Sequence, residues 1–236
     1  MKSDFNLDSQ SNNQIVIQTR NLCKTFGEKD TLVKALDDVS LDIKAGEFSA
    51  IIGPSGSGKS TLLQMIGGLD VADSGEIILA GNNIADLSSG ALTRFRRDHI
   101  GFIFQSYNLI PVLSAAENVE YIMLLQGIEK VERKERTFEI LKQVGLLGRE
   151  NRRPGQLSGG QQQRVAVARA MVSKPDIILA DEPTANLDSK TGIELLDMMK
   201  ELNEVHKMTF LFSTHDPKIM DRATRLIQLV DGKLTD

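Results

Sequence analysis

Eight consecutive residues, Gly53-Pro54-Ser55-Gly56-Ser57-Gly58-Lys59-Ser60, have the types and spacing of a loop that holds phosphate groups. The three glycines let the backbone turn its N–H groups inward around a phosphate, which would also lie at the positive end of the following helix. We expect Lys59 to reach the β- and γ-phosphates, Ser60 to place its hydroxyl on Mg²⁺, and Thr61 to complete the binding segment. The alternative is an ordinary Gly/Ser turn with a solvated lysine, but the apolar run before the loop and the apolar periodicity after it favour a phosphate loop.

A pair of acidic residues follows the apolar run Ile177–Ala180, which has the pattern of a strand buried on both faces of a parallel sheet. We expect Asp181 to lie on the magnesium side of the site, acting directly or through a water. Glu182 would then face the γ-phosphate and orient or deprotonate the attacking water. The alternative is that the pair is simply a solvated strand end, which would be the better interpretation of an Asp-Glu pair without a phosphate loop in the same chain.

The segment Leu157-Ser158-Gly159-Gly160-Gln161 predicts the start of a helix that runs to about Met171. Ser158 is a plausible N-cap, and Gln161 completes the capping-box pattern. A cap does not explain Gly159 and Gly160, which lower helix propensity where bare N–H groups could meet a phosphate. We therefore expect a second anion site that serves the γ-phosphate bound by a partner subunit, with a simple capped helix as the alternative.

The elements that would hold these residues alternate between strand and helix patterns. Helices are predicted over 115–126 and 131–144, and no strong strand signal appears from 106 to 156. This order predicts an α/β fold with a mainly parallel sheet, a small antiparallel β flank from the early strands, and a helical subdomain at about 106–170. Strands are predicted near 15–18, 48–52, 76–80, 99–104, 176–181, 209–213 and 225–230.

The composition limits the classes of protein to which the chain can belong. Its 236 residues are 41% hydrophobic, enough to bury one α/β core, predicted for 15–236. No apolar run approaches the roughly 20 residues of a transmembrane helix, and the polar residues 1–14 predict a flexible tail rather than a signal peptide. The single cysteine, Cys23, excludes an internal disulfide and fits a reducing cytosol. A net charge of −4 gives no basic footprint for nucleic acid.

The three chemical segments, which follow one another along the chain as phosphate loop, Gly-rich helix start and acidic pair, resemble those of the ATP-binding subunits of ABC transporters, and the resemblance runs from about residue 15 to the C-terminus. The pentapeptide Leu157–Gln161 is similar to the signature sequence of that family. The resemblance implies a phosphate-loop ATPase fold of the ABC type, with ATP and Mg²⁺ as the bound groups.

The resemblance also implies roles for residues outside the three segments. Phe26 is similar to the aromatic residue that stacks on adenine, and Gln105 to the glutamine of the Q-loop. Asp188 ends a stretch that resembles the D-loop, and His215 is similar to the switch histidine that touches the γ-phosphate. The catalytic residues implied are Lys59, Gln105, Glu182 and His215, and the metal ligands implied are Ser60, Gln105 and Asp181.

Within the family, the chain most resembles the lipoprotein-releasing (LolD-type) and macrolide-exporting (MacB-type) branch. Two departures from the pattern of that branch are Ala185 in place of glycine and the stretch 121–123 in place of a Leu-Pro-Leu-like one. The segments that carry the resemblance are 46–48, 66–70, 96–102, 105–111 and 116–119.

The resemblance implies that two copies close head to tail over two ATP molecules and drive a separate membrane permease from the cytoplasmic face of the membrane. The permease would dock near 105–120, where the loop from Tyr107 to Val112 is rich in apolar residues. The alternative for that loop is that it covers the core of the helical subdomain.

Two other functions compete with this one. A soluble ABC ATPase acting on the ribosome or on DNA would usually carry a second cassette or a long coiled coil, and this chain shows neither. A phosphate-loop kinase leaves Leu157–Gln161 without a role. The sequence leaves the cargo open.

Overall fold

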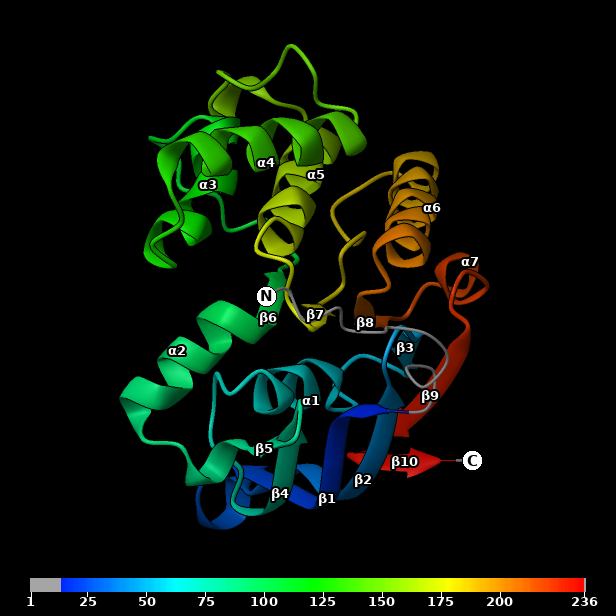
Figure 1. Cartoon of the computed structure of the whole chain (residues 1–236). Helices are drawn as coiled ribbons and strands as arrows, with labels where there is room; N and C mark the ends of the chain where they lie inside the picture. The colour runs from blue at the N-terminus through cyan, green and yellow to red at the C-terminus, as the bar shows by residue number, and fades with distance from the viewer. Residues whose placement is uncertain (1–13, 236) are drawn as a thin grey trace.

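The computed structural model describes residues 14–235, and a six-stranded sheet carries the elements of the phosphate loop (Figure 1). Its strand order is β10-β9-β3-β8-β7-β6. The neighbours from β9 to β6 pair in parallel, while β10 pairs antiparallel at the edge. The strands are β3 (Phe48–Ile52), β6 (Ile100–Ile103), β7 (Ile177–Ala180), β8 (Thr209–Thr214), β9 (Arg225–Val230) and β10 (Lys233–Thr235).

The central strands of this sheet are covered on both faces. Every residue of β7 and of β8 is buried, as expected for parallel strands with near-continuous apolar sequence. Because the strands run in one direction, the loops after β3, β7 and β8 meet at the same edge of the sheet. The phosphate loop, the acidic pair and His215 are therefore brought to one place.

A second, four-stranded sheet is antiparallel, with the order β2-β1-β4-β5. Its strands are β1 (Ile15–Phe26), β2 (Val33–Lys44), β4 (Ser74–Leu79) and β5 (Asn82–Asn83). The predicted antiparallel flank is confirmed, but the strand predicted at 15–18 is much longer. Asn21 has a φ of 47°, and the pairing of β1 with β2 shifts register nearby, so the alternation that marks a strand is interrupted there.

Three of the helices gather at one end of the molecule. Figure 1 shows α3, α4 and α5 at the top, the antiparallel sheet at the bottom and the parallel strands between them. The two helices predicted at 115–126 and 131–144 are observed as α3 and α4, and the helix predicted to end near Met171 as α5. The helices are α1 (Lys59–Ile66), α2 (Ser89–His99), α3 (Ala115–Leu125), α4 (Lys130–Gln143), α5 (Gly159–Met171), α6 (Ser189–His206) and α7 (Pro217–Met220).

Some element boundaries differ from those that the sequence predicts. His99 ends α2, so the strand predicted at 99–104 begins one residue later, as β6. The elements β2, β5, β10, α2, α6 and α7 were not predicted. The tail predicted at 1–14 lies outside the described residues except for Gln14, and the division of the chain into domains stays a prediction.

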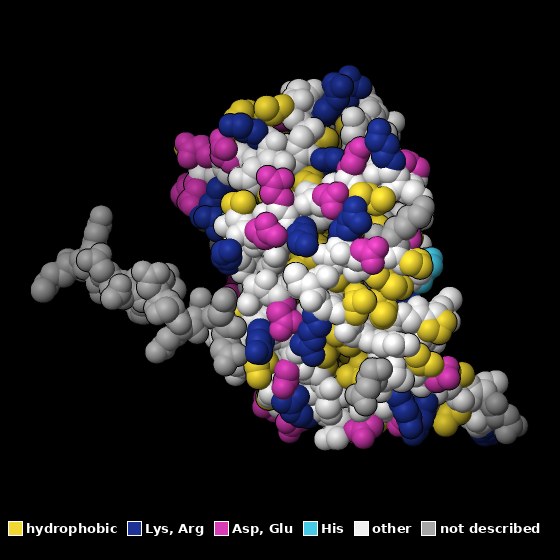
Figure 2. Space-filling view, turned by 90° about the vertical axis from the view of Figure 1, so that its right-hand side faces the viewer, with side chains coloured by type: hydrophobic (Ala, Val, Ile, Leu, Met, Phe, Trp, Pro, Cys, Tyr) yellow, Lys and Arg dark blue, Asp and Glu magenta, His cyan; other side chains and the backbone are white. Residues whose placement is uncertain are grey.

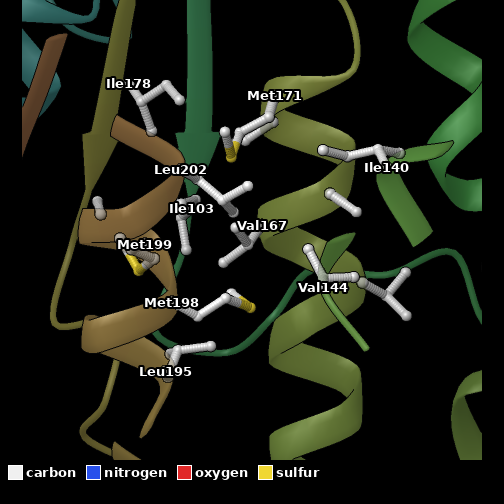
Figure 3. Close-up of a cluster of buried hydrophobic side chains, with 14 of the residues drawn as sticks. Ile103, Ile140, Val144, Val167, Met171, Ile178, Leu195, Met198, Met199 and Leu202 are labelled. Carbon is white, nitrogen blue, oxygen red and sulfur yellow. The ribbon is translucent and has the colours of Figure 1, made fainter. Parts of the chain in front are cut away.

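The core around α5 joins the helical part to the parallel sheet. Figure 3 shows Val167 and Met171 of α5 between side chains of α6 on one side and of α4 on the other. All belong to one buried cluster that also includes Ile178 of β7. Such a packed cluster makes α5 a rigid connection between the two parts. Within residues 14–235, no helix is both long and apolar enough to cross a membrane.

Candidate nucleotide site

The phosphate loop connects β3 to α1, and its glycines are required by the backbone. A Cβ on Gly53 would lie 2.0 Å from the carbonyl oxygen of Leu229, and one on Gly58 would lie 2.3 Å from that of Ala35. Gly58 also has a φ of 102°, which L side chains rarely adopt. Gly56, with a φ of 80°, faces open space, since nothing lies within 4 Å of its would-be Cβ.

Lys59 is buried inside the curve of this loop. Its ammonium donates hydrogen bonds to the carbonyl oxygens of Gly53 and Pro54, both at 2.9 Å. The N-terminal N–H groups of α1 have no partners within their own helix. A buried cation and these N–H groups together suit a phosphate.

The loop lines a cleft of about 640 Å³ together with residues from four other segments. Gln105 comes from the segment after β6, Glu182 and Ala185 from the segment after β7, and His215 from the segment directly after β8. The phosphate-loop side of the cleft is formed by Pro54, Ser55, Gly56, Gly58, Lys59, Ser60 and Thr61, with Val33 and Ala35 from β2.

The two acids are held in different environments. Asp181 accepts a hydrogen bond from the Ser60 hydroxyl at 2.9 Å, so the two predicted metal ligands are in contact. Glu182 lies next to His215, with 2.9 Å between the carboxylate Oε1 and the imidazole Nδ1. The His215 side chain is 64% exposed, whereas that of Glu182 is only 14% exposed. The carboxylate is thus sheltered, and the imidazole faces the opening.

The residues present fit a nucleotide with Mg²⁺. Within the described part of the chain, no group of three or more His, Cys, Asp or Glu residues could hold a metal ion by itself. Ser60 and Asp181 instead offer a few oxygen ligands beside the phosphate loop, the arrangement that Mg²⁺ uses when phosphates supply the rest. Gln105 lines the same cleft and can add its amide oxygen.

Several predicted site residues outside the signature are not among those that line the cleft: Gly53 and Ser57 of the loop, Asp181, Phe26 and Asp188. Phe26 ends β1 with its ring 44% exposed, and the Lys24 ammonium lies 5.2 Å from the ring centroid. Asp188 is the N-cap of α6. Its oxygens accept hydrogen bonds from the Thr191 hydroxyl and from backbone N–H groups, which lower the pKa of this carboxyl. The nucleotide contacts of Phe26 and Asp188 stay predictions.

The signature segment lies outside this cleft. The capping box is present as predicted: Ser158 Oγ accepts from the Gln161 N–H, and the Gln161 side chain accepts from the Ser158 N–H. The two glycines also have packing partners in the chain itself. A Cβ on Gly159 would lie 2.9 Å from the Tyr107 hydroxyl, and one on Gly160 would lie 2.6 Å from Cγ2 of Thr191.

Sequence reasoning missed several polar residues that hold the site. Ser213, Gln163 and Asn118 are buried. Asn118 fixes the segment after Gln105, since it exchanges hydrogen bonds with the backbone of Ile110 and donates to two further carbonyls. Ser213 carries only a weak signal, since it is a polar side chain after an apolar run in a strand that also contains two threonines. Gln163 carries no such signal, because glutamine is ordinary in a helix.

A phosphate loop between a parallel strand and a helix, with acidic residues at the end of a neighbouring strand, defines the class of phosphate-loop nucleotide hydrolases. A family model described as "ABC transporter" matches residues 36–185. The chain therefore belongs to the ABC transporter family, and within it to the ATP-hydrolysing cassettes.

Similar proteins agree with this assignment. An uncharacterized ABC transporter ATP-binding protein of Methanocaldococcus jannaschii, MJ0796, is 47% identical over 223 residues, covering 93% of this chain and 95% of the relative. The macrolide export ATP-binding/permease protein MacB of Hyphomonas neptunium is 47% identical over 219 residues, covering 93% of this chain and 34% of the relative. The chain thus spans about a third of the length of this relative.

A solved structure shares the fold. A dimeric structure of the MJ0796 cassette in a post-hydrolysis state with ADP and Pi has a TM-score of 0.85 and 45% identity, covering 93% of this chain and 97% of that one. The predicted fold class, and the resemblance to the branch that includes MacB-type ATPases, are confirmed.

Proposed function

We propose that this protein is the ATP-binding and ATP-hydrolysing subunit of a membrane transport complex, in which two copies close head to tail over two ATP molecules and drive a separate permease. The observation that carries the proposal is the cleft in which the phosphate loop, Gln105, Glu182 and His215 meet. The arrangement suits attack of water on a γ-phosphate bound at the loop.

In this proposal each residue of the site has a separate role. Lys59 exchanges its two backbone carbonyl partners for phosphate oxygens. Ser60, Asp181 and Gln105 hold Mg²⁺, which neutralises charge on the phosphates. Glu182 orients the attacking water and accepts its proton, and His215 supports that carboxylate from the open side of the cleft.

The second copy would supply the signature segment. In one chain, Ser158, Gly159 and Gly160 are not among the residues that line the cleft, although the N-terminus of α5 is a favourable place for an anion. Closure of two copies would bring that N-terminus to the γ-phosphate held by the other chain. The dimeric MJ0796 structures support this part of the proposal.

A groove of about 340 Å³ supports docking of a permease near residues 105–120. It combines apolar and cationic side chains, which suits a short amphipathic helix with acidic residues. Arg169 of α5 closes one wall and donates to the carbonyls of Tyr107 and Asn108. Burial lowers the pKa of this guanidinium, which nevertheless stays charged. The lining includes Leu69, Arg96, Arg97, Phe102, Phe104, Asn108, Tyr121, Ile122 and Arg169.

Some residues of the predicted docking loop, 107–112, cover the core, and others are exposed and available to a partner. Leu109 packs against the core of the helical part, as the alternative interpretation expects. Val112 is 68% exposed, and Tyr121 of the neighbouring helix is 43% exposed. We therefore assign docking to the exposed side chains and to the groove rather than to Leu109.

The competing function is a soluble ABC ATPase without a permease. The groove favours an ATPase coupled to a permease, as do the MacB relatives, which are named as ATP-binding/permease proteins. Interspersed positive and negative side chains on the face in Figure 2 give no support for a nucleic-acid partner there. A subunit bound to a permease would lie on the cytoplasmic face of the membrane.

The proposal is tested by reconstituting the chain with a candidate permease, sought among the products of the neighbouring genes. ATP hydrolysis that requires Mg²⁺, and that changes when the permease is added, is the expected result. A chain that hydrolyses ATP at the same rate with and without any permease, and does not co-purify with one, would instead be the soluble ATPase.

A further inference from the structure

A serine lies in the middle of the apolar sheet, at a position to which the sequence gives no role. Ser213 is the penultimate residue of β8, between β3 and β7, and it is completely buried. The three residues before it, Phe210, Leu211 and Phe212, are also completely buried. A hydroxyl in such a place is unfavourable unless its hydrogen-bonding capacity is used.

The Ser213 hydroxyl makes one donated and one accepted hydrogen bond, both with the two acidic residues. It donates to Asp181 Oδ1 at 2.7 Å and accepts from the backbone N–H of Glu182 at 2.9 Å. The same oxygen of Asp181 also accepts from Ser60. One buried side chain therefore connects the predicted metal ligand to the predicted general base.

The backbone at Glu182 needs such a partner. Its φ is 46°, a left-handed conformation that a residue with a side chain rarely adopts, and the surrounding structure must hold it there. The Ser213 hydroxyl fixes the N–H on one side of this residue. The carbonyl of the next residue, Pro183, is fixed from α5 by the Gln163 side chain at 2.7 Å.

We propose that Ser213 is a positioning residue that sets the Asp181 carboxylate for Mg²⁺ and the Glu182 backbone for the attacking water at the same time. The inference rests on the proposed function, because it assumes the roles given there to the two acids. When the Ser60 hydroxyl turns from Asp181 to the metal, Ser213 stays as the donor that holds Asp181 in place. Hydrogen-bond partners of metal ligands typically contribute about 10–100-fold to metal affinity or activity.

The test compares Ser213→Ala with Thr19→Val. Thr19 is an equally buried residue whose hydroxyl donates to the Val39 carbonyl in the antiparallel sheet, so the control loses a buried hydrogen bond away from the cleft. Affinity for a fluorescent ATP analogue is measured with EDTA and over a Mg²⁺ titration, in the Glu182→Gln background, where turnover does not interfere. Turnover is measured separately in the background with Glu182 intact.

We expect Ser213→Ala to leave nucleotide affinity in EDTA unchanged, to raise the Mg²⁺ concentration for half-maximal tight binding about tenfold, and to lower kcat about tenfold or more with little change in KM. Ser213→Cys, with a weaker donor of similar size, should fall between serine and alanine. Thr19→Val should match the unmodified protein in all these measurements.

Two results overturn the inference in different ways. If the unmodified chain binds and hydrolyses Mg²⁺-ATP normally while Ser213→Ala behaves like Thr19→Val, Ser213 has no positioning role. If the unmodified chain does not bind the nucleotide at all, the proposed function falls and this inference falls with it.

Discussion

At the scale of single residues, the sheltered Glu182 carboxylate and the exposed His215 imidazole form the part of the cleft best suited to activating water. The 2.9 Å contact between them uses only one of the two carboxylate oxygens of Glu182, Oε1. General-base catalysis requires the base within hydrogen-bond reach of the proton it accepts. The proposed role of Glu182 follows from this position.

Replacing Glu182 by Gln should separate binding from hydrolysis. The amide keeps the shape of the side chain but cannot accept the proton of the attacking water, so turnover should fall roughly 10²-fold or more while ATP still binds. The measurement is steady-state phosphate release beside equilibrium binding of ATP. The control Glu194→Gln removes a carboxylate from α6 outside the cleft lining and should leave turnover unchanged. Near-normal hydrolysis by the Glu182 variant, with the permease present, would remove this residue from the base role.

Much of the residue-level site could be predicted because its parts are local in sequence. The phosphate loop and the acidic pair each occupy a short segment, and their spacing alone indicates their chemistry. Ser213 and Gln163 could not be predicted, because their roles depend on contacts with residues 181–183 that exist only after the sheet and α5 have packed. The contact of Gly160 with Thr191 is of the same kind.

At the scale of elements, helix α5 connects three parts of the site. Its N-terminus carries the signature glycines, Gln163 in its first half donates to the carbonyl of Pro183, and Arg169 near its end holds the docking loop. Its middle lies in the core shown in Figure 3. A rigid displacement of α5 would therefore act on the turn that carries Glu182 and on the loop at the groove together.

Replacing Gln163 by Leu should weaken the connection between α5 and the catalytic turn. The variant should fold, because leucine fits a buried helix position and removes the Gln163 Oε1, which has no hydrogen-bond partner. Turnover should fall about tenfold, since Pro183 loses its partner while ATP binding is retained. The measurement is kcat and KM for ATP together with the melting temperature.

A matched control for this experiment is Gln126→Leu. Gln126 also has a buried Oε1 without a hydrogen-bond partner among the described residues, and its amide donates to the Arg97 carbonyl and to Asp98 Oδ1, away from the catalytic turn. Equal effects of the two substitutions on kcat would mean that Gln163 contributes stability only.

Strands and helices could be predicted where the hydrophobic pattern is regular, as in β7, β9 and α3. The prediction missed the strand β2, although Val39, Leu41 and Ile43 alternate with more exposed residues there. The adjacent Asp37 and Asp38 interrupt that alternation, and Asp38 has a φ of 61°. Pairing with β1 over most of its length makes the strand in spite of this irregularity.

At the scale of the whole molecule, the proposed dimer predicts that a charge at Gly159 blocks closure. Gly159→Asp places a carboxylate at the surface expected to meet the γ-phosphate, so each monomer should still bind ATP while ATP-driven dimerisation fails. Light scattering in the Glu182→Gln background is the measurement, because there the ATP is not consumed.

Gly159→Ala is the necessary control, because any side chain at this position approaches the Tyr107 hydroxyl. That hydroxyl is the far end of a flexible side chain and can move, so alanine should largely preserve dimerisation. If the Gly159→Asp variant dimerises as well as the Gly159→Ala variant, the head-to-tail arrangement is wrong. If both variants fail to dimerise to the same extent, the cause is a steric conflict within each chain and not the charge.

The proposed docking groove predicts a loss of coupling from Tyr121→Ser. Tyr121 lines the groove and is largely solvent-accessible, so its loss should weaken co-purification with the permease while the isolated subunit keeps its melting temperature and ATP affinity. Val131→Ser, at a still more exposed position on α4, is the control and should have no effect. Leu109→Ser should instead lower the melting temperature, because Leu109 packs on the core. Undiminished permease binding by the Tyr121 variant would move the docking site elsewhere.

The support of the phosphate loop by the last hairpin has a consequence for biosynthesis. Gly53 packs against the Leu229 carbonyl, and the Gly232 N–H donates to the carbonyl of Ser57 at 3.0 Å. Because translation proceeds from the N-terminus, the ribosome releases the loop long before it releases these partners. A nascent chain that stops short of Leu229 carries the complete loop sequence without the backbone against which the loop is shaped. The support that shapes the loop is therefore present only once the last hairpin has been made, and ATP that binds the finished protein stabilises it by mass action.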